Sequence, residues 1–204
     1  MTWNEDGILE LIANALEYQS SKFDGEQAVR GIDCLTENEL RDRIRESLIA
    51  ADIQAVHEER YPDAKCIERR NYGHHCDLVL LPSDTPSELK ADPDWCAAGY
   101  WLEIKRVSQF LESGPNWWYE YALLEAIPQD IYKLAKDSKI FYAGLLLVLF
   151  SANSQSGNSD LKIWKRRAIE KGCPVGVPRI HHFSITNRLG NERAFIALFP
   201  LRRL

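Results

Sequence analysis

The segment from 140 to 150, IFYAGLLLVLF, contains no charged residue, and it restricts the fold of this chain more than any other feature. It is well short of the ~20 apolar residues that a membrane-spanning helix needs. An apolar run of this kind, rich in β-branched and aromatic side chains, is typical of a strand that is buried on both faces. We therefore place the central strand of a sheet here and expect an α/β domain.

The order of the other elements predicts a mixed sheet flanked by helices. We expect helices at 8–16, 36–51, 117–136 and 161–171, strands at 53–61, 78–81, 97–107 and 140–150, and a terminal hairpin of 180–186 with 194–199. Thr36 and Glu39 form a capping-box pattern, and the Ser- and Asn-rich segment 151–159 has the composition of a linker. The sequence thus predicts one α/β domain with an α-β-β-β-α-β core at 36–150. A helical extension (1–35) precedes this core, and a basic helix with a β-hairpin (160–204) follows it.

The charge is unevenly distributed along the 204 residues, whose formal net charge is −5. Residues 161–204 carry ten Lys or Arg and two acids, whereas residues 1–160 carry 15 and 28. Taken as a whole, 25 basic against 30 acidic residues is not the composition of a histone-like protein that coats DNA. The basic C-terminal quarter indicates either a local site for an anionic partner or a solvated basic helix face.

The cysteines and the N-terminus suggest a cellular compartment. The five cysteines include no C-x-x-C pair, which argues against a zinc ribbon or a disulfide framework and favours a reducing compartment. The first residues, MTWNED, lack the basic and apolar regions of a signal peptide. We expect a cytoplasmic protein with no membrane partner.

Three residues carry the chemistry that interests us most: Asp77, Glu103 and Lys105. Glu103 and Lys105 project to one side of their strand because side chains alternate along a strand. Asp77 begins the apolar part of the preceding strand, so pairing of the two strands would bring two carboxylates and an ammonium together. Two hard oxygen ligands suit Mg²⁺. The lysine can hold a water molecule or stabilise negative charge as water attacks a phosphodiester.

The acid-x-Lys pattern alone has a simpler interpretation, a surface Glu–Lys ion pair. The pattern occurs five times in the chain. Only Glu103-Ile104-Lys105 lies within a strand-like segment that follows another strand carrying an acid. The context of the pattern therefore favours a catalytic site.

At these residues the chain resembles the PD-(D/E)XK nuclease superfamily, which has the restriction-endonuclease-like fold. The resemblance covers residues 36–150, with Cys76 in place of the proline and a long insertion between Asp77 and Glu103. It implies that Asp77 and Glu103 bind Mg²⁺, with Mn²⁺ tolerated, and that Lys105 activates or positions the attacking water. It also implies an acid near the start of the first core helix. We assign this role to Glu39, whose alternative role is in the capping box.

Several other acidic, histidine and aromatic residues are weaker candidates for the site. Glu46 could replace Glu39 as the helix acid, and Glu58 or Glu59 could approach the metal. His75 could contact a phosphate near Asp77, although the adjacent histidines at 74–75 and 181–182 cannot easily chelate one ion. The aromatic residues at 117–121 are expected to pack between helix and sheet, with base stacking as the alternative.

The basic helix supplies the nucleic-acid contacts that we predict. Its polar side carries Lys162, Lys165, Arg166 and Arg167, which could bind a phosphate backbone without reading its sequence. The N-terminal helix either packs on the core or forms a homodimer interface. The sequence thus predicts a metal-dependent nuclease, with DNA favoured over RNA as substrate. The alternative is a non-catalytic module of the same fold within a defence or repair complex.

Overall fold

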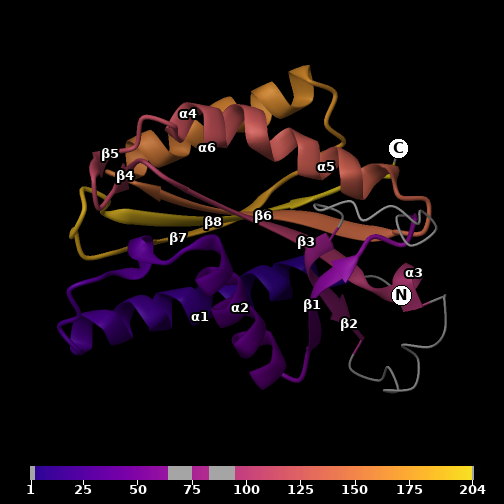
Figure 1. Cartoon of the computed structure of the whole chain (residues 1–204), viewed down its shortest axis with the longest axis horizontal. Coiled ribbons are helices and arrows are strands. Elements are labelled where there is room, and N and C mark those ends of the chain that lie inside the picture. The colour runs from indigo at the N-terminus through magenta and orange to yellow at the C-terminus, as the bar shows by residue number, and fades with distance from the viewer. Residues whose placement is uncertain (1–2, 64–74, 83–94, 204) are drawn as a thin grey trace.

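A six-stranded mixed sheet forms the centre of the protein in a computed structural model that describes residues 3–63, 75–82 and 95–203 (Figure 1). Its spatial order is β1-β2-β3-β6-β8-β7. The strands span Gln54–Arg60 (β1), His75–Leu81 (β2), Tyr100–Ser108 (β3), Tyr142–Ser151 (β6), Arg179–Ser184 (β7) and Arg193–Pro200 (β8). A two-stranded ribbon of β4 (Phe110–Leu111) and β5 (Gly114–Pro115) follows β3.

The central pair of strands runs parallel, and every other neighbouring pair of this sheet is antiparallel. β6 pairs with β3 in parallel along the whole of Tyr100–Ser108, and β8 covers its other edge. All residues of β6 from Ala143 to Ser151 are buried. The predicted central strand is therefore confirmed, as are the α/β class and the C-terminal hairpin formed by β7 and β8.

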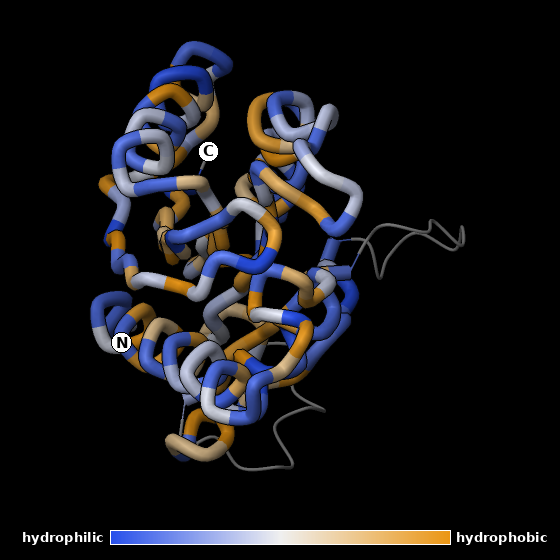
Figure 2. The backbone as a smooth tube through the Cα atoms, turned by 90° about the vertical axis from the view of Figure 1, so that its left-hand side faces the viewer, coloured by the Kyte–Doolittle hydropathy of each residue, from blue (hydrophilic) through white to orange (hydrophobic). Residues whose placement is uncertain are grey.

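Helices cover both faces of the sheet, as Figures 1 and 2 show from two directions. They span Glu5–Gly25 (α1), Ile32–Cys34 (η1), Glu37–Ala50 (α2), Trp95–Ala98 (α3), Tyr119–Tyr121 (α4), Ala122–Ala126 (η4, a π-helical segment), Ile127–Lys136 (α5) and Ser154–Glu170 (α6). α1 and α2 lie on one face, where α1 buries its apolar stripe against the sheet. The N-terminal helix thus packs on the core, the first of the two roles considered for it.

The opposite face is covered by the continuous helical segment α4-η4-α5 and by α6. Their apolar side chains pack on Leu145, Leu147 and Leu149 of β6 and on β8. The predicted helix 117–136 is confirmed with a π-helical segment inside it, and Pro128 occupies the first turn of α5. Among the described residues, no helix combines the length and the apolar character that crossing a membrane requires.

The linker predicted at 151–159 is wrong, because α6 begins within it at Ser154. The side chain of Asn153 caps the helix by accepting a hydrogen bond of 2.9 Å from the Ser156 amide. Gly157 is buried where α6 crosses the sheet, and a Cβ atom there would lie 2.2 Å from Cε2 of Phe195. The small and polar residues of this segment therefore serve capping and close packing rather than flexibility.

The predicted capping box at the start of α2 is confirmed and gives a first testable expectation. The Thr36 hydroxyl accepts from the Glu39 amide at 3.2 Å, and the Glu39 carboxylate accepts from the Thr36 amide at 2.7 Å. Thr36→Ala should lower the free energy of unfolding by about 1 kcal/mol, measured by urea denaturation. Ser47→Ala within the same helix is the control, with a change of less than about 0.5 kcal/mol. Equal effects of the two variants would contradict this role.

Candidate functional site

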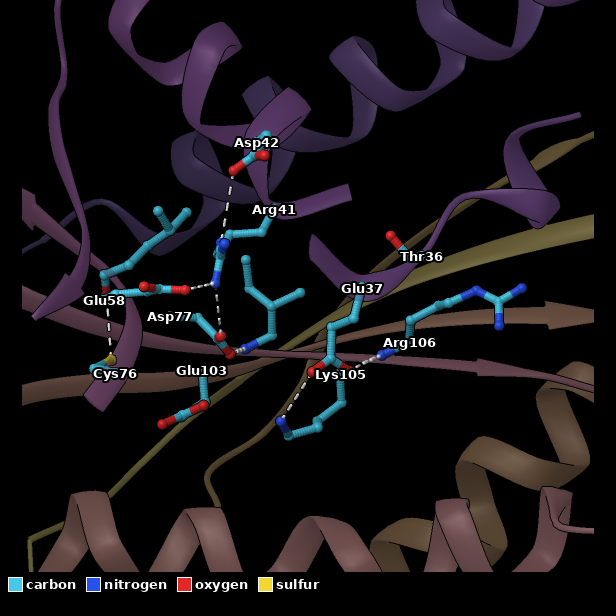
Figure 3. A network of polar contacts seen from close by, with 12 residues as sticks. Thr36, Glu37, Arg41, Asp42, Glu58, Cys76, Asp77, Glu103, Lys105 and Arg106 are labelled. Atoms are coloured by element: carbon cyan, nitrogen blue, oxygen red, sulfur yellow. Dashed lines mark hydrogen bonds and ion pairs between the residues drawn. The ribbon is translucent and has the colours of Figure 1, made fainter. Parts of the chain in front are cut away.

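The candidate site lies where β2 separates from β3. The two strands pair only over Leu78–Leu80 and Tyr100–Leu102, so Asp77 and Glu103 are the next residues along them. Beyond this point the amides on the open edge of β3 bond to carboxylates. The Ile104 amide donates to Oδ2 of Asp77 at 2.8 Å, and the Arg106 amide donates to Oε2 of Glu37 at 3.0 Å. Where β2 no longer pairs with β3, carboxylate side chains thus accept the hydrogen bonds of the β3 amides, and they form an acidic site (Figure 3).

Glu103 is held in a nearly closed environment. Its side chain accepts a hydrogen bond from the hydroxyl of Tyr61, and both residues are buried. Burial and then the neighbouring Asp77 carboxylate raise the pKa of Glu103 well above its usual range, against the opposing effects of Tyr61 and Lys105. Two neighbouring acids of this kind can both be ionised only if a positive charge lies close to them.

Lys105 lies on the same side of β3 as Glu103 and is held between the two helical layers. Its Nζ is 3.2 Å from Oε1 of Glu37 on α2 and 3.3 Å from Oδ2 of Asp130 on α5. Burial lowers the pKa of Lys105, but Glu37, Asp130 and the strand acids outweigh it and raise that pKa above its usual value. Lys105 therefore provides a fixed ammonium group that can donate hydrogen bonds, rather than a base.

A second cation, Arg41 of α2, approaches the site from the other side. Its guanidinium Nη1 is 3.0 Å from Oε1 of Glu58 on β1 and 3.8 Å from Oδ1 of Asp77. Figure 3 shows Arg41 above the Asp77 and Glu103 pair, with Lys105 on the far side of Asp77. Of the two acids, Arg41 thus approaches Asp77 alone, while the charge of Lys105 acts on both Asp77 and Glu103.

The carboxylates fit a divalent cation that keeps much of its water. The described residues contain no group of three or more His, Cys, Asp or Glu side chains arranged to hold a metal ion. Mg²⁺, however, is commonly bound through one or two carboxylates, with water molecules completing its octahedral coordination. Asp77 and Glu103, which lie opposite each other at the end of the β2–β3 pairing, supply two hard oxygen donors for such an ion.

The helix acid that reaches β3 is Glu37 rather than the predicted Glu39. Glu39 is engaged in the capping box with Thr36, while Glu37 contacts Lys105 and the Arg106 amide. The capping-box pattern in the sequence could have indicated this, because it already gives the Glu39 side chain a partner at the start of the helix. Glu46, the reserve candidate, pairs with Arg43 at 3.2 Å on the exposed side of α2.

Sequence reasoning also missed Tyr61 and Asp130, and it did not predict the fixed position of Arg41.

Cys76, which stands in place of the proline of the motif, is fully buried, and its thiol donates to the Leu78 carbonyl at 3.3 Å. Burial, Glu103 and Asp77 raise the pKa of Cys76, which keeps the thiol protonated. The insertion predicted between Asp77 and Glu103 lies mostly outside the described residues, as does His74, while His75 is exposed at the start of β2.

The predicted nucleic-acid-binding residues lie on a different part of the molecule. Lys162, Arg166 and Arg167 are exposed on α6 and Lys165 is partly exposed, while the stripe of Leu161, Trp164 and Ala168 is buried as expected. α6 contacts β6 and β8, whereas α5 is the helix of this layer that contacts β3. The four basic side chains therefore lie on a different helix of this layer from the one that contacts β3.

The aromatic cluster after β5 does not pack as expected. Trp117 is 92% exposed and Trp118 is 73% exposed, and only Tyr119 packs against the core helices and strands. The segment is nevertheless fixed, since Asn116 bonds the Ser108 carbonyl at 2.9 Å and accepts from the Trp118 amide at 3.0 Å. The packing prediction for the two tryptophans is wrong, and their faces are open to solvent.

A pocket of about 350 Å³ lies at the start of α2, and Arg106 is the residue of β3 that lines it. Its walls include Thr36, the β4–β5 ribbon, and the side chains of Arg30 and Arg106. The Arg106 guanidinium donates to the Asp33 carbonyl, but its buried Nε has no hydrogen-bond partner. The pocket thus holds two arginines together with Asp33 and Glu112, and Arg30 is ion-paired with Glu112 at 2.9 Å.

Comparison with known proteins adds no relative. No protein-family model, curated protein sequence or solved structure matches this chain. Its function must therefore be argued from the residues of the site.

Proposed function

We propose that the protein is a Mg²⁺-dependent nuclease that hydrolyses phosphodiester bonds, with DNA rather than RNA as its substrate. The observation that carries the proposal is the meeting of Asp77, Glu103 and Lys105 at the point where β2 leaves β3. The succession of α2, β1, β2, β3, α4 to α5 and β6 agrees with the helix, three strands, helix and strand of the PD-(D/E)XK superfamily. Both the site and its place in the element order support this assignment.

In this proposal each residue of the site has a distinct role. Asp77 and Glu103 would hold Mg²⁺, which supplies a nucleophilic water at neutral pH and neutralises charge on the phosphate. Lys105 orients the attacking water and stabilises the charge that develops on the phosphoryl oxygens. Glu37 and Asp130 keep the Lys105 ammonium in place from both sides. In the pocket at the start of α2, Arg30 would contact the nucleic-acid backbone by exchanging its ion pair with Glu112 for a phosphate.

The alternative is a non-catalytic module of the same fold that assembles with other proteins. The exposed Trp117 and Trp118 favour it, because large exposed aromatic groups often mark a binding surface. A measurement of metal binding distinguishes the two functions. A module without a metal site should show no stabilisation by Mg²⁺ or Mn²⁺.

The deciding experiment compares the protein with Asp77→Asn. This substitution removes a charge but keeps an oxygen that can accept from the Ile104 amide. Labelled linear, circular and single-stranded DNA and RNA are incubated with Mg²⁺, Mn²⁺ or EDTA. We expect cutting with either metal, none with EDTA and only background with Asp77→Asn. At about 100 times its dissociation constant, Mg²⁺ should raise the free energy of unfolding by about 2.7 kcal/mol.

The variant should lose most of this stabilisation while remaining folded. A folded protein that neither cuts any of these substrates nor gains stability from either metal would refute the nuclease proposal and favour the module.

A further inference from the structure

The ladder between β1 and β2 is interrupted at one position, and an acidic residue stands there. His57 pairs with Leu78 and Glu59 pairs with Cys76, so the unchanged register sets Glu58 opposite Asp77. This intermediate pair is missing from the ladder, and Glu58 has a φ of 53°. A positive φ is uncommon for a residue with a long side chain and stores backbone strain. Strain of this kind is often found where a side chain must be held in a particular direction.

The strained residue contacts the buried arginine of the candidate site. Arg41 is only 8% exposed, and its Nη1 donates to Oε1 of Glu58 at 3.0 Å. The same Nη1 is 3.8 Å from Oδ1 of Asp77, which is within ion-pair range but too far for a hydrogen bond. The buried Nε of Arg41 has no hydrogen-bond partner, and Oδ1 of Asp42 lies 3.7 Å from it. The Arg41 guanidinium therefore hydrogen-bonds Glu58 and makes only a longer ion pair with Asp77.

This preference determines whether Asp77 can serve a metal ion. If the guanidinium hydrogen-bonded Asp77 directly, it would occupy Oδ1, the oxygen that does not accept from the Ile104 amide, and it would repel an incoming divalent cation. Glu58 draws the guanidinium away and neutralises part of its charge. Asp77 then keeps Oδ2 on the Ile104 amide and leaves Oδ1 without a hydrogen bond from Arg41.

We propose that Glu58 is a positioning residue that holds Arg41 away from Asp77 and thereby keeps Asp77 available to a divalent cation. The proposal rests on the Asp77 and Glu103 metal site of the proposed function, but it does not depend on cleavage. Glu58 acts only through Arg41 and is not itself a ligand. Its removal should therefore weaken metal binding only while Arg41 is present.

Mn²⁺ affinity, measured by titration calorimetry on the full chain without nucleic acid, tests this proposal. Glu58→Gln should weaken Mn²⁺ binding by about 10–100-fold, the usual effect of losing a residue that orients a metal ligand. Arg41→Met should bind Mn²⁺ more tightly than the unaltered protein. Adding Glu58→Gln to Arg41→Met should then have no further effect, which is the double-mutant signature of action through Arg41. If Arg41→Met does not fold, Arg41→Gln takes its place.

The control is Asp52→Asn, which removes the same charge from the exposed turn between α2 and β1. It should leave the Mn²⁺ affinity unchanged. Unaltered affinity in Glu58→Gln would overturn the proposal, as would an equal loss in the Arg41→Met background, which would make Glu58 a direct ligand. Absence of Mn²⁺ binding by the unaltered protein would overturn it too. Binding that follows the expected pattern in a protein that cuts no nucleic acid would refute the nuclease and leave this inference standing.

Discussion

Replacing Lys105 with alanine is expected to reduce metal-dependent cleavage by about 10²–10³-fold, the usual effect of removing one group that stabilises transition-state charge. The Nζ of Lys105 is fixed between Glu37 and Asp130, so its charge is already in place before the substrate arrives. Single-turnover cleavage at saturating Mg²⁺ measures the chemical step directly. Lys139→Ala is the matched control, since Lys139 belongs to another acid-x-Lys sequence but is exposed outside the sheet.

The same substitution should also affect stability, which sequence reasoning did not anticipate. An exposed strand lysine contributes little, but the Lys105 side chain is only 21% exposed and has two carboxylate partners. Its loss leaves Glu37 and Asp130 without their shared cation and should cost about 1–3 kcal/mol. The variant must therefore be assayed well below its unfolding midpoint. A folded Lys105→Ala protein that cuts at the full rate would refute the role we give to this residue.

Patterns of short range in the sequence predicted the fold well. The charge-free segment 140–150 identified the central strand because a strand buried on both faces has no polar positions. Thr36 with Glu39 located the start of α2, because a capping box is a local hydrogen-bond pattern. The runs 180–186 and 194–199 located the terminal hairpin, since each of them suits a strand and they are close in the sequence.

The meeting of Asp77, Glu103 and Lys105 could also be predicted, whereas the residues that surround them could not. Asp77, Glu103 and Lys105 follow from strand alternation and from the pairing of consecutive strands. Glu37 and Asp130 come from helices on opposite faces of the sheet, and their contact with Lys105 depends on how those helices pack. No sequence signal marks such a meeting.

Two further differences arise because residue type does not determine environment. Aromatic residues are usually buried, so the segment with Trp117 and Trp118 was assigned to the core, although their rings face solvent. Glu58 adopts a left-handed conformation that glycine would accept more readily, and nothing in the sequence QAVHEER indicates it. All three residues stand out only once the fold is known. Local conflicts of this kind are expected at functional sites.

The largest effect on stability is expected from Trp101→Ala, which also tests how packing supports the site. Trp101 is fully buried, and its Nε1 donates to the Cys96 carbonyl at 3.0 Å. Its ring lies between those of Trp95 and Tyr61, with centroid distances of 6.0 Å in both cases. Tyr61 in turn donates to Glu103. The substitution should lower the free energy of unfolding by about 3–5 kcal/mol, measured by urea denaturation.

Trp117→Ala provides the matched control, because it makes the same chemical change at a side chain that is 92% exposed. It should change the free energy of unfolding by less than about 0.5 kcal/mol. In Trp101→Ala the Tyr61 ring loses the surface that supports it, so Glu103 loses a fixed hydrogen-bond donor. We therefore expect the folded fraction of Trp101→Ala to bind Mn²⁺ with altered affinity, while Trp117→Ala binds it normally. Similar losses of stability in the two variants would show that Trp101 does not support this part of the core.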